Sequence, residues 1–287
     1  MLDQAEALRK LIINEEQENN SNTATKIMTI TSGKGGVGKS NFVVNLAICL
    51  QNKGKKVLIF DADLGMGNDD VLMGLYPKYN IFDIIYNGLE IKDIIIEGTN
   101  GVGLIPAGSA LSKAQELEES EKKLFIEKLE TLDEYDYILM DTGAGVNKDV
   151  LSFIAASEEI IIITTPEPTS LTDGYSLIKA TDHYKLKTKA KIIVNKAFTK
   201  EEGQETYNKF DKAVRKFLTI DIEYLGCILE DRKLILSVRQ QKPFMVLYPN
   251  CDAARDIESI AMKLVGQETN SSNGAKGLFK RLFNIFS

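Results

Sequence analysis

The 287-residue chain contains no tryptophan, one histidine and three cysteines. The single imidazole, that of His183, excludes zinc and iron sites that need several histidine ligands. The cysteines Cys49, Cys227 and Cys251 are far apart in the chain and form no CxxC pair, so we interpret them as reduced thiols of the core. Any catalytic chemistry must therefore come from carboxylates, lysines, hydroxyls and backbone amides.

Long apolar runs and an excess of positive charge are also missing. No run approaches the roughly 18 apolar residues of a transmembrane helix, and the acidic N-terminus does not resemble a secretory signal. We therefore expect a cytoplasmic protein. The net charge of −6 argues against a DNA-binding surface that covers the whole chain.

The residues that are present divide the chain into several parts. An amphipathic segment at 1–13 and a polar linker at 14–25 precede a large body at 26–265, and a second polar linker at 266–274 leads to a tail at 275–287. In the body, apolar β-branched runs alternate with helical patterns, which predicts a single doubly wound α/β sheet of about seven to eight mostly parallel strands. The expected strands are Ile27–Thr31, Val57–Asp61, Gly103–Pro106, Tyr137–Asp141, Ile160–Thr165, Lys191–Asn195 and Tyr224–Leu229.

A glycine-rich segment follows the first expected strand and precedes a helical pattern. It fits GxxxxGK[ST] and consists of Gly33, Lys34, Gly35, Gly36, Val37, Gly38, Lys39 and Ser40. Glycines allow successive backbone amides to surround phosphate oxygens, and the helix N-terminus adds partial positive charge. In such a loop Lys39 contacts the β- and γ-phosphates and Ser40 binds Mg²⁺. The segment therefore predicts a site for a nucleotide with Mg²⁺.

Carboxylates stand at the ends of two other expected strands. Asp61 and Asp63 follow one apolar run, and Asp141 ends another. Ligands of such sheets bind at the carboxyl ends of the strands. We expect Asp61 and Asp141 to hold Mg²⁺ through water, and Asp63 to orient or deprotonate an attacking water. Aspartates that cap ordinary turns are the alternative.

The loop contains a lysine in addition to Lys39, namely Lys34, which gives the pattern KGGxGK[ST]. This pattern resembles that of the deviant Walker A ATPases, a family that includes MinD, ParA, the nitrogenase iron protein and the arsenite-pump ATPase. The resemblance implies ATP as the nucleotide and a homodimer in the ATP state, in which Lys34 reaches the partner's phosphates. It also implies a catalytic role for Asp63, which lies in the family's DxDxG pattern, and adenine contacts for Asn195 and Glu230. Farther along the chain, we expect Ser170 to be the N-cap of a helix.

The tail combines an apolar helical face with basic charge. The apolar residues that fall on one side of a helix include Leu278, Phe279, Leu282, Phe283 and Phe286. This pattern, with its basic opposite face, predicts a helix that binds anionic lipids reversibly at the cytoplasmic face of the cell membrane. MinD resembles this arrangement at its C-terminus. A helix docked against the core is the alternative.

The N-terminal segment narrows the resemblance. Asp3, Gln4, Ala5, Leu8 and Arg9 fit the DQAxxLR pattern of the FlhG family (also called FleN or YlxH), MinD-like regulators of flagellar number. The resemblance extends over almost the whole chain. It implies that this segment binds an FlhF-type GTPase and stimulates its hydrolysis of GTP, and it makes flagellar basal-body proteins further candidate partners.

Two other functions remain open from the sequence. A MinD-type division-site regulator would share the loop and the tail but would not need the DQA segment. A ParA-like partitioning ATPase would bind DNA, which the acidic balance and the apolar tail disfavour. An electron-transfer role like that of the nitrogenase iron protein is excluded, because no cluster cysteine follows the segment Asp141–Gly145.

Overall fold

The computed structural model describes residues 25–63, 67–81, 83–106, 121, 124, 128, 130–266, 275, 277, 278 and 280–282. The predicted partner-binding residues of the N-terminal segment lie outside these ranges, as do three residues of the predicted lipid-binding face: Phe279, Phe283 and Phe286.

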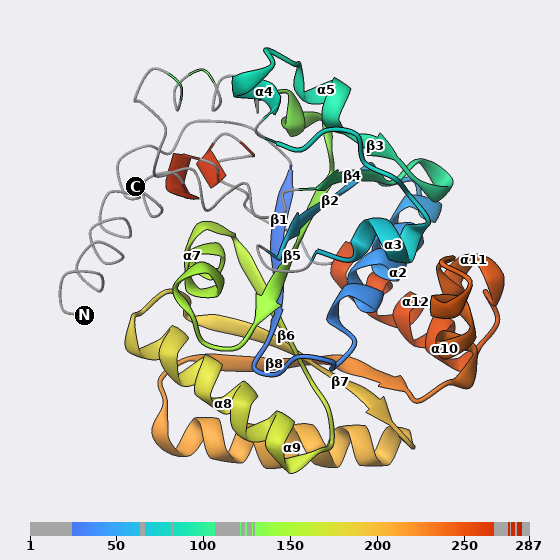
Figure 1. The fold of residues 1–287 in the computed structure, drawn as a ribbon. Coiled ribbons are helices and arrows are strands. Elements are labelled where there is room, and N and C mark those ends of the chain that lie inside the picture. Colours follow the sequence, from blue (N-terminus) through green and yellow to red (C-terminus); the bar gives the residue numbers. More distant parts are fainter. Residues whose placement is uncertain are drawn as a thin grey trace.

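An eight-stranded sheet forms the centre of the fold (Figure 1). The strands are β1 (Lys26–Ser32), β2 (Val57–Ala62), β3 (Ile96–Glu97), β4 (Gly103–Pro106), β5 (Tyr137–Ala144), β6 (Glu159–Thr164), β7 (Lys189–Ala197) and β8 (Asp221–Leu229). Their order is β3-β4-β2-β5-β1-β6-β7-β8, and every pairing is parallel except that of β3 with β4. The predicted fold class is confirmed. The two residues of β3 were not predicted as a strand.

Helices cover both faces of this sheet (Figure 1). They are α2 (Lys39–Asn52), α3 (Asp69–Met73), α4 (Asp83–Tyr86), α5 (Ile91–Ile94), α7 (Lys148–Ala156), α8 (Pro168–His183), α9 (Lys200–Phe217), α10 (Arg232–Arg239), α11 (Phe244–Leu247) and α12 (Asp252–Val265), with short 3₁₀ helices at Thr99–Gly101 and Glu130–Glu134. Helices α2 and α12 pack together on one face, and α7, α8 and α9 pack on the other. None of the helices in the described ranges is long and apolar enough to cross a membrane.

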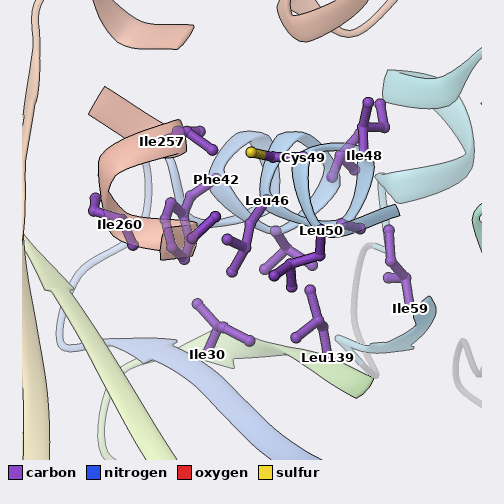
Figure 2. Close-up of a cluster of buried hydrophobic side chains, with 14 of the residues drawn as sticks. Ile30, Phe42, Leu46, Ile48, Cys49, Leu50, Ile59, Leu139, Ile257 and Ile260 are labelled. Carbon is purple, nitrogen blue, oxygen red and sulfur yellow. The ribbon is translucent and has the colours of Figure 1, made fainter. Parts of the chain in front are cut away.

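Helix α2 is buried on nearly all sides. Its residues from position 42 to position 50 are all buried, and a helix that is apolar all round requires neighbours on every side. Figure 2 shows how this is achieved: Phe42 and Leu46 lie between Ile30 and Leu139 of the sheet and Ile257 of α12. Because α2 begins where the glycine-rich segment ends, the core fixes the position of that segment.

The described part of the tail packs against the body. Ala275, Leu278 and Leu282 are fully buried in a cluster with Phe60 and Phe153. At the start of this segment the Ala275 amide donates a hydrogen bond to the Asp133 carboxylate over 2.6 Å. This placement corresponds to the docked alternative, whereas the binding of Leu278 and Leu282 to lipid stays a prediction.

Two smaller expectations have clear outcomes. The three cysteines are free and buried, as predicted.

The prediction that Ser170 caps a helix is wrong: α8 begins at Pro168, with Glu167 as the N-cap residue. Proline is favoured at this first position because its fixed φ suits a helix. The Ser170 hydroxyl instead accepts the Thr165 amide hydrogen at 3.0 Å inside the fold.

Candidate nucleotide-binding site

The glycine-rich loop connects β1 to α2 at the carboxyl end of β1. Gly36 and Gly38 have φ values of 78° and 93°, which only glycine adopts at little cost. At Gly33 an added Cβ would lie 2.1 Å from the backbone of Asp173 in α8. The glycines therefore allow both the turn and its close approach to a neighbouring helix.

Lys39 forms a buried ion pair with Asp141. Its Nζ atom lies 2.7 Å from Oδ1 of Asp141, and the two side chains are 9% and 2% exposed. Asp141 stands in β5, directly beside Asp61 in β2. The structure thus brings together three residues that the sequence placed at one site, and it gives Lys39 an anionic partner where phosphate is expected.

Asp61 lies deep in this group of charges. It accepts the backbone amide of Asp63 over 3.2 Å. Burial, and then the neighbouring Asp141 carboxylate, raise the pKa of Asp61 to about 7. Two carboxylates so close together favour a cation between them or a proton on one of them.

Asp69 was not predicted as a site residue. It is fully buried at the start of α3, and burial together with the carboxylates of Asp141 and Asp61 raises its pKa well above the usual range. In the sequence, Asp69 and Asp70 resemble the acidic residues that often begin helices. Only the fold shows that Asp69 turns inward, because its burial depends on how α3 packs beside α2 and β4.

Mg²⁺ fits this group when the nucleotide supplies some of its ligands. Among the described residues, no three acidic, histidine or cysteine side chains are arranged to hold a metal ion alone. Mg²⁺ commonly keeps several waters and binds through one or two carboxylates plus phosphates. The Ser40 hydroxyl, together with water held by Asp61 and Asp141, matches that requirement.

Asp63 faces a separate space beside the loop. It lines a cavity of about 240 Å³ with Gly143, Ala144 and Asn147, which follow Asp141 in the chain. A Cβ at Gly143 would lie 3.5 Å from the Asp63 carboxylate. The cavity is large enough for water, so this arrangement suits a carboxylate that positions a water molecule.

Lys34 is held on the outer side of the site by residues at the start of α8. Its Nζ atom donates to Glu167 over 3.0 Å and to the Thr169 hydroxyl over 2.9 Å. The same lysine lowers the pKa of Glu167 below its usual value. The pair is exposed, so it is weak and can be exchanged for another anion.

The two predicted adenine-contacting residues are placed differently. The Asn195 side chain is buried and donates to the Val37 carbonyl in the loop over 2.7 Å. Beside it, Lys196 donates to the Gly36 carbonyl over 2.8 Å. Glu230 follows β8 and is exposed. Adenine binding by Asn195 and Glu230 stays a prediction, but Asn195 clearly belongs to the surroundings of the loop.

Comparisons with known proteins identify the family of this chain. A family model described as an AAA domain (AAA_31) matches residues 25–194. The "Flagellum site-determining protein YlxH" of Helicobacter pylori is 37% identical over 270 residues, which are 90% of each chain. The "Antiactivator FleN" of Pseudomonas aeruginosa is 34% identical over 247 residues, 86% of each chain.

Solved structures show the same fold. A chain of the MinC:MinD cell division protein complex of Aquifex aeolicus matches with a TM-score of 0.69 and 26% identity, over 87% of this chain and 99% of that one. The septum site-determining protein MinD of Pyrococcus horikoshii, solved with Mg-ADP, matches with a TM-score of 0.65 and 24% identity, over 86% of this chain and 100% of the other.

The ion pair between Lys39 and Asp141 leads to a prediction about stability without nucleotide. Lys39→Met removes the cation that faces the buried carboxylates, and we expect it to lower the free energy of unfolding by about 3–5 kcal/mol. Asp141→Asn removes the partner as well as a repulsive charge. The double variant should therefore lose about 1–3 kcal/mol less free energy of unfolding than the two single variants lose together. Urea unfolding of wild type and the three variants measures this difference, and additivity within about 0.5 kcal/mol would contradict an energetic coupling between Lys39 and Asp141.

Proposed function

The chain belongs to the MinD/ParA-type AAA_31 ATPases, and from this we propose that it is an ATP-hydrolysing switch that dimerises with ATP, associates with the membrane and regulates flagellar number or placement. The observation that carries the proposal is the convergence of Lys39, Asp61 and Asp141 beside the glycine-rich loop. The family is one of P-loop ATPases, and the MinD of P. horikoshii was solved with Mg-ADP.

Each residue of the site has a role in the proposed hydrolysis. The loop amides bind the phosphates, and Lys39 exchanges Asp141 for them. Ser40, together with water held by Asp61 and Asp141, would hold Mg²⁺, which would supply positive charge to neutralise the phosphates. Asp63 orients the attacking water from its cavity. Lys34 leaves Glu167 for the partner's phosphates when two chains close on ATP, which adds positive charge only in the dimer.

Asp63 provides the direct test of hydrolysis. We expect Asp63→Ala to lower ATP turnover by about 10²–10⁴-fold, because a positioned base contributes that much, while ATP binding stays close to wild type. Asp149→Ala is the matched control, because Asp149 lines the same cavity but belongs to α7 rather than to the end of β2. Phosphate release measures ATP turnover, and fluorescent ATP measures ATP binding. Unchanged turnover in the Asp63 variant would rule out the assigned role.

The flagellar part of the proposal rests on the relatives and on the N-terminal segment. Both relatives match most of this chain. One is named a flagellum site-determining protein (YlxH), and the other is named an antiactivator (FleN). We infer that residues 1–13 bind an FlhF-type GTPase and that basal-body proteins bind the body.

Deletion of residues 1–24 tests this inference, because it leaves the described body intact. The truncated protein should hydrolyse ATP like wild type but no longer bind an FlhF-type GTPase or stimulate its GTP hydrolysis. A full-length Gln4→Ala variant should still bind the GTPase but should stimulate its GTP hydrolysis less than wild type does. Undiminished binding by the truncated protein would favour the MinD-type alternative instead.

Membrane association has a structural condition. Leu278 and Leu282 are buried against the body, so they cannot contact lipid in the same arrangement. Each tail alone should bind weakly, because the cost of ordering offsets much of the gain from basic charge and apolar contact. Two tails on an ATP-closed dimer gain roughly 10²–10⁴ in effective affinity.

Vesicle sedimentation tests this part of the proposal. With anionic vesicles, the Asp63→Ala protein should sediment with ATP and much less with ADP, and a chain that ends at Gly274 should sediment with neither. Neutral vesicles serve as the control for attraction between the basic residues of the tail and anionic lipids. Equal sedimentation with ATP and ADP would contradict a nucleotide-dependent membrane switch.

A further inference from the structure

Asp69 is a buried carboxyl whose presence the packing of the fold does not explain. It is fully inaccessible to solvent, and neither of its oxygens has a hydrogen-bond partner among the described residues. A buried polar group without a partner lowers stability. Such a group persists when another state of the protein uses it, and sites that bind a ligand are where such groups concentrate.

The surroundings of Asp69 indicate which ligand it serves. Its side chain faces the carboxylates of Asp141 and Asp61 and the ammonium group of Lys39. Three carboxyl groups therefore share one ammonium group in a pocket closed to water. When phosphates attract Lys39, these carboxyl groups need another cation, and a divalent ion matches the excess of negative charge.

Asp69 also joins the two strands that carry the other carboxylates. Its backbone amide donates to Asp61 at the end of β2, while its side chain lies against Asp141 in β5. Two carboxylates hydrogen bond to each other only when one of them carries a proton, so in the empty pocket this contact needs either a proton or a cation. A hydrated cation would replace that proton, because its bound waters donate hydrogen bonds to carboxylates.

We propose that Asp69 is a positioning residue of the Mg²⁺ site, which orients Asp141 and Asp61 and accepts a hydrogen bond from the hydrated ion. The inference rests on the proposed nucleotide site and extends it by a residue outside the loop, the DxD pair and the end of β5. Asp69 does not touch the phosphates and takes no part in the attack of water. Its role is to make nucleotide binding depend more strongly on Mg²⁺.

The test measures how Mg²⁺ changes the affinity for a fluorescent ADP. Wild type, Asp69→Asn and Asp69→Ala are titrated with ADP in EDTA and at a series of Mg²⁺ concentrations, in the full chain. In the Asp69 variants, we expect the Mg²⁺ concentration for half of the effect to rise about 10–100-fold, as for other residues that orient metal ligands. ADP affinity in EDTA should stay within about twofold of wild type, because Asp69 is not a phosphate ligand.

Asp70→Asn is the matched control. Asp70 is the next residue of α3, is partly exposed and accepts its neighbour's amide hydrogen at Val71. It should leave the Mg²⁺ dependence unchanged. Thermal unfolding without nucleotide gives a second readout: Asp69→Asn should unfold at the wild-type temperature or a few degrees above it, because the amide is neutral without having to hold a proton beside Asp141 and Asp61.

The possible outcomes distinguish a failure of the proposed nucleotide site from a failure of the proposed role of Asp69. If wild type does not bind ADP, the proposed nucleotide site itself fails, and if it binds ADP without dependence on Mg²⁺, the proposed Mg²⁺ site fails. If wild type depends on Mg²⁺ and Asp69→Asn depends on it equally, the role of Asp69 is overturned while the site stands. Loss of ADP binding in EDTA, with a lower unfolding temperature, would also overturn it, because both variants would then have damaged the fold rather than the Mg²⁺ dependence.

Discussion

The buried ion pair between Lys39 and Asp141 is the interaction on which the rest of the site depends. A lone buried charge is very costly, and Asp61 and Asp69 add further carboxyl groups to the same pocket. Lys39 is therefore the cation that allows the pocket to exist without a ligand. Its position is fixed by the core, because Lys39 is the first residue of α2 and α2 is enclosed by the sheet and α12.

The loop in front of Lys39 is held by contacts from distant parts of the chain. Asn195 and Lys196, at the end of β7, donate to loop carbonyls, and Gly33 touches the backbone of α8. Lys34 is tied to the residues at the start of the same helix. Any change of the loop must therefore alter its contacts with β7 and α8.

Much of this arrangement could be predicted from the sequence, and the failures have physical reasons. Parallel strands buried on both faces leave continuous apolar runs, as in Ile160–Thr165, so seven strands were found; β3 has two residues and no such run. The glycine loop and the strand-end aspartates follow local patterns. Asp69 follows none, because its burial is decided by tertiary packing. Likewise, helical periodicity gives the tail the same apolar face whether it meets lipid or the core.

In the proposed function, nucleotide binding at this site is an exchange of ionic partners. Lys39 leaves Asp141 for phosphate more readily when another cation compensates the carboxylates, and a hydrated divalent ion is a cation that phosphates commonly bind. The two ligands must then favour each other's binding, by the same factor in both directions. The excess of carboxyl groups lowers the stability of the empty pocket and raises that of the loaded one. A difference of this sign between two states is what a nucleotide-dependent switch requires, because a ligand shifts an equilibrium only by its differential affinity.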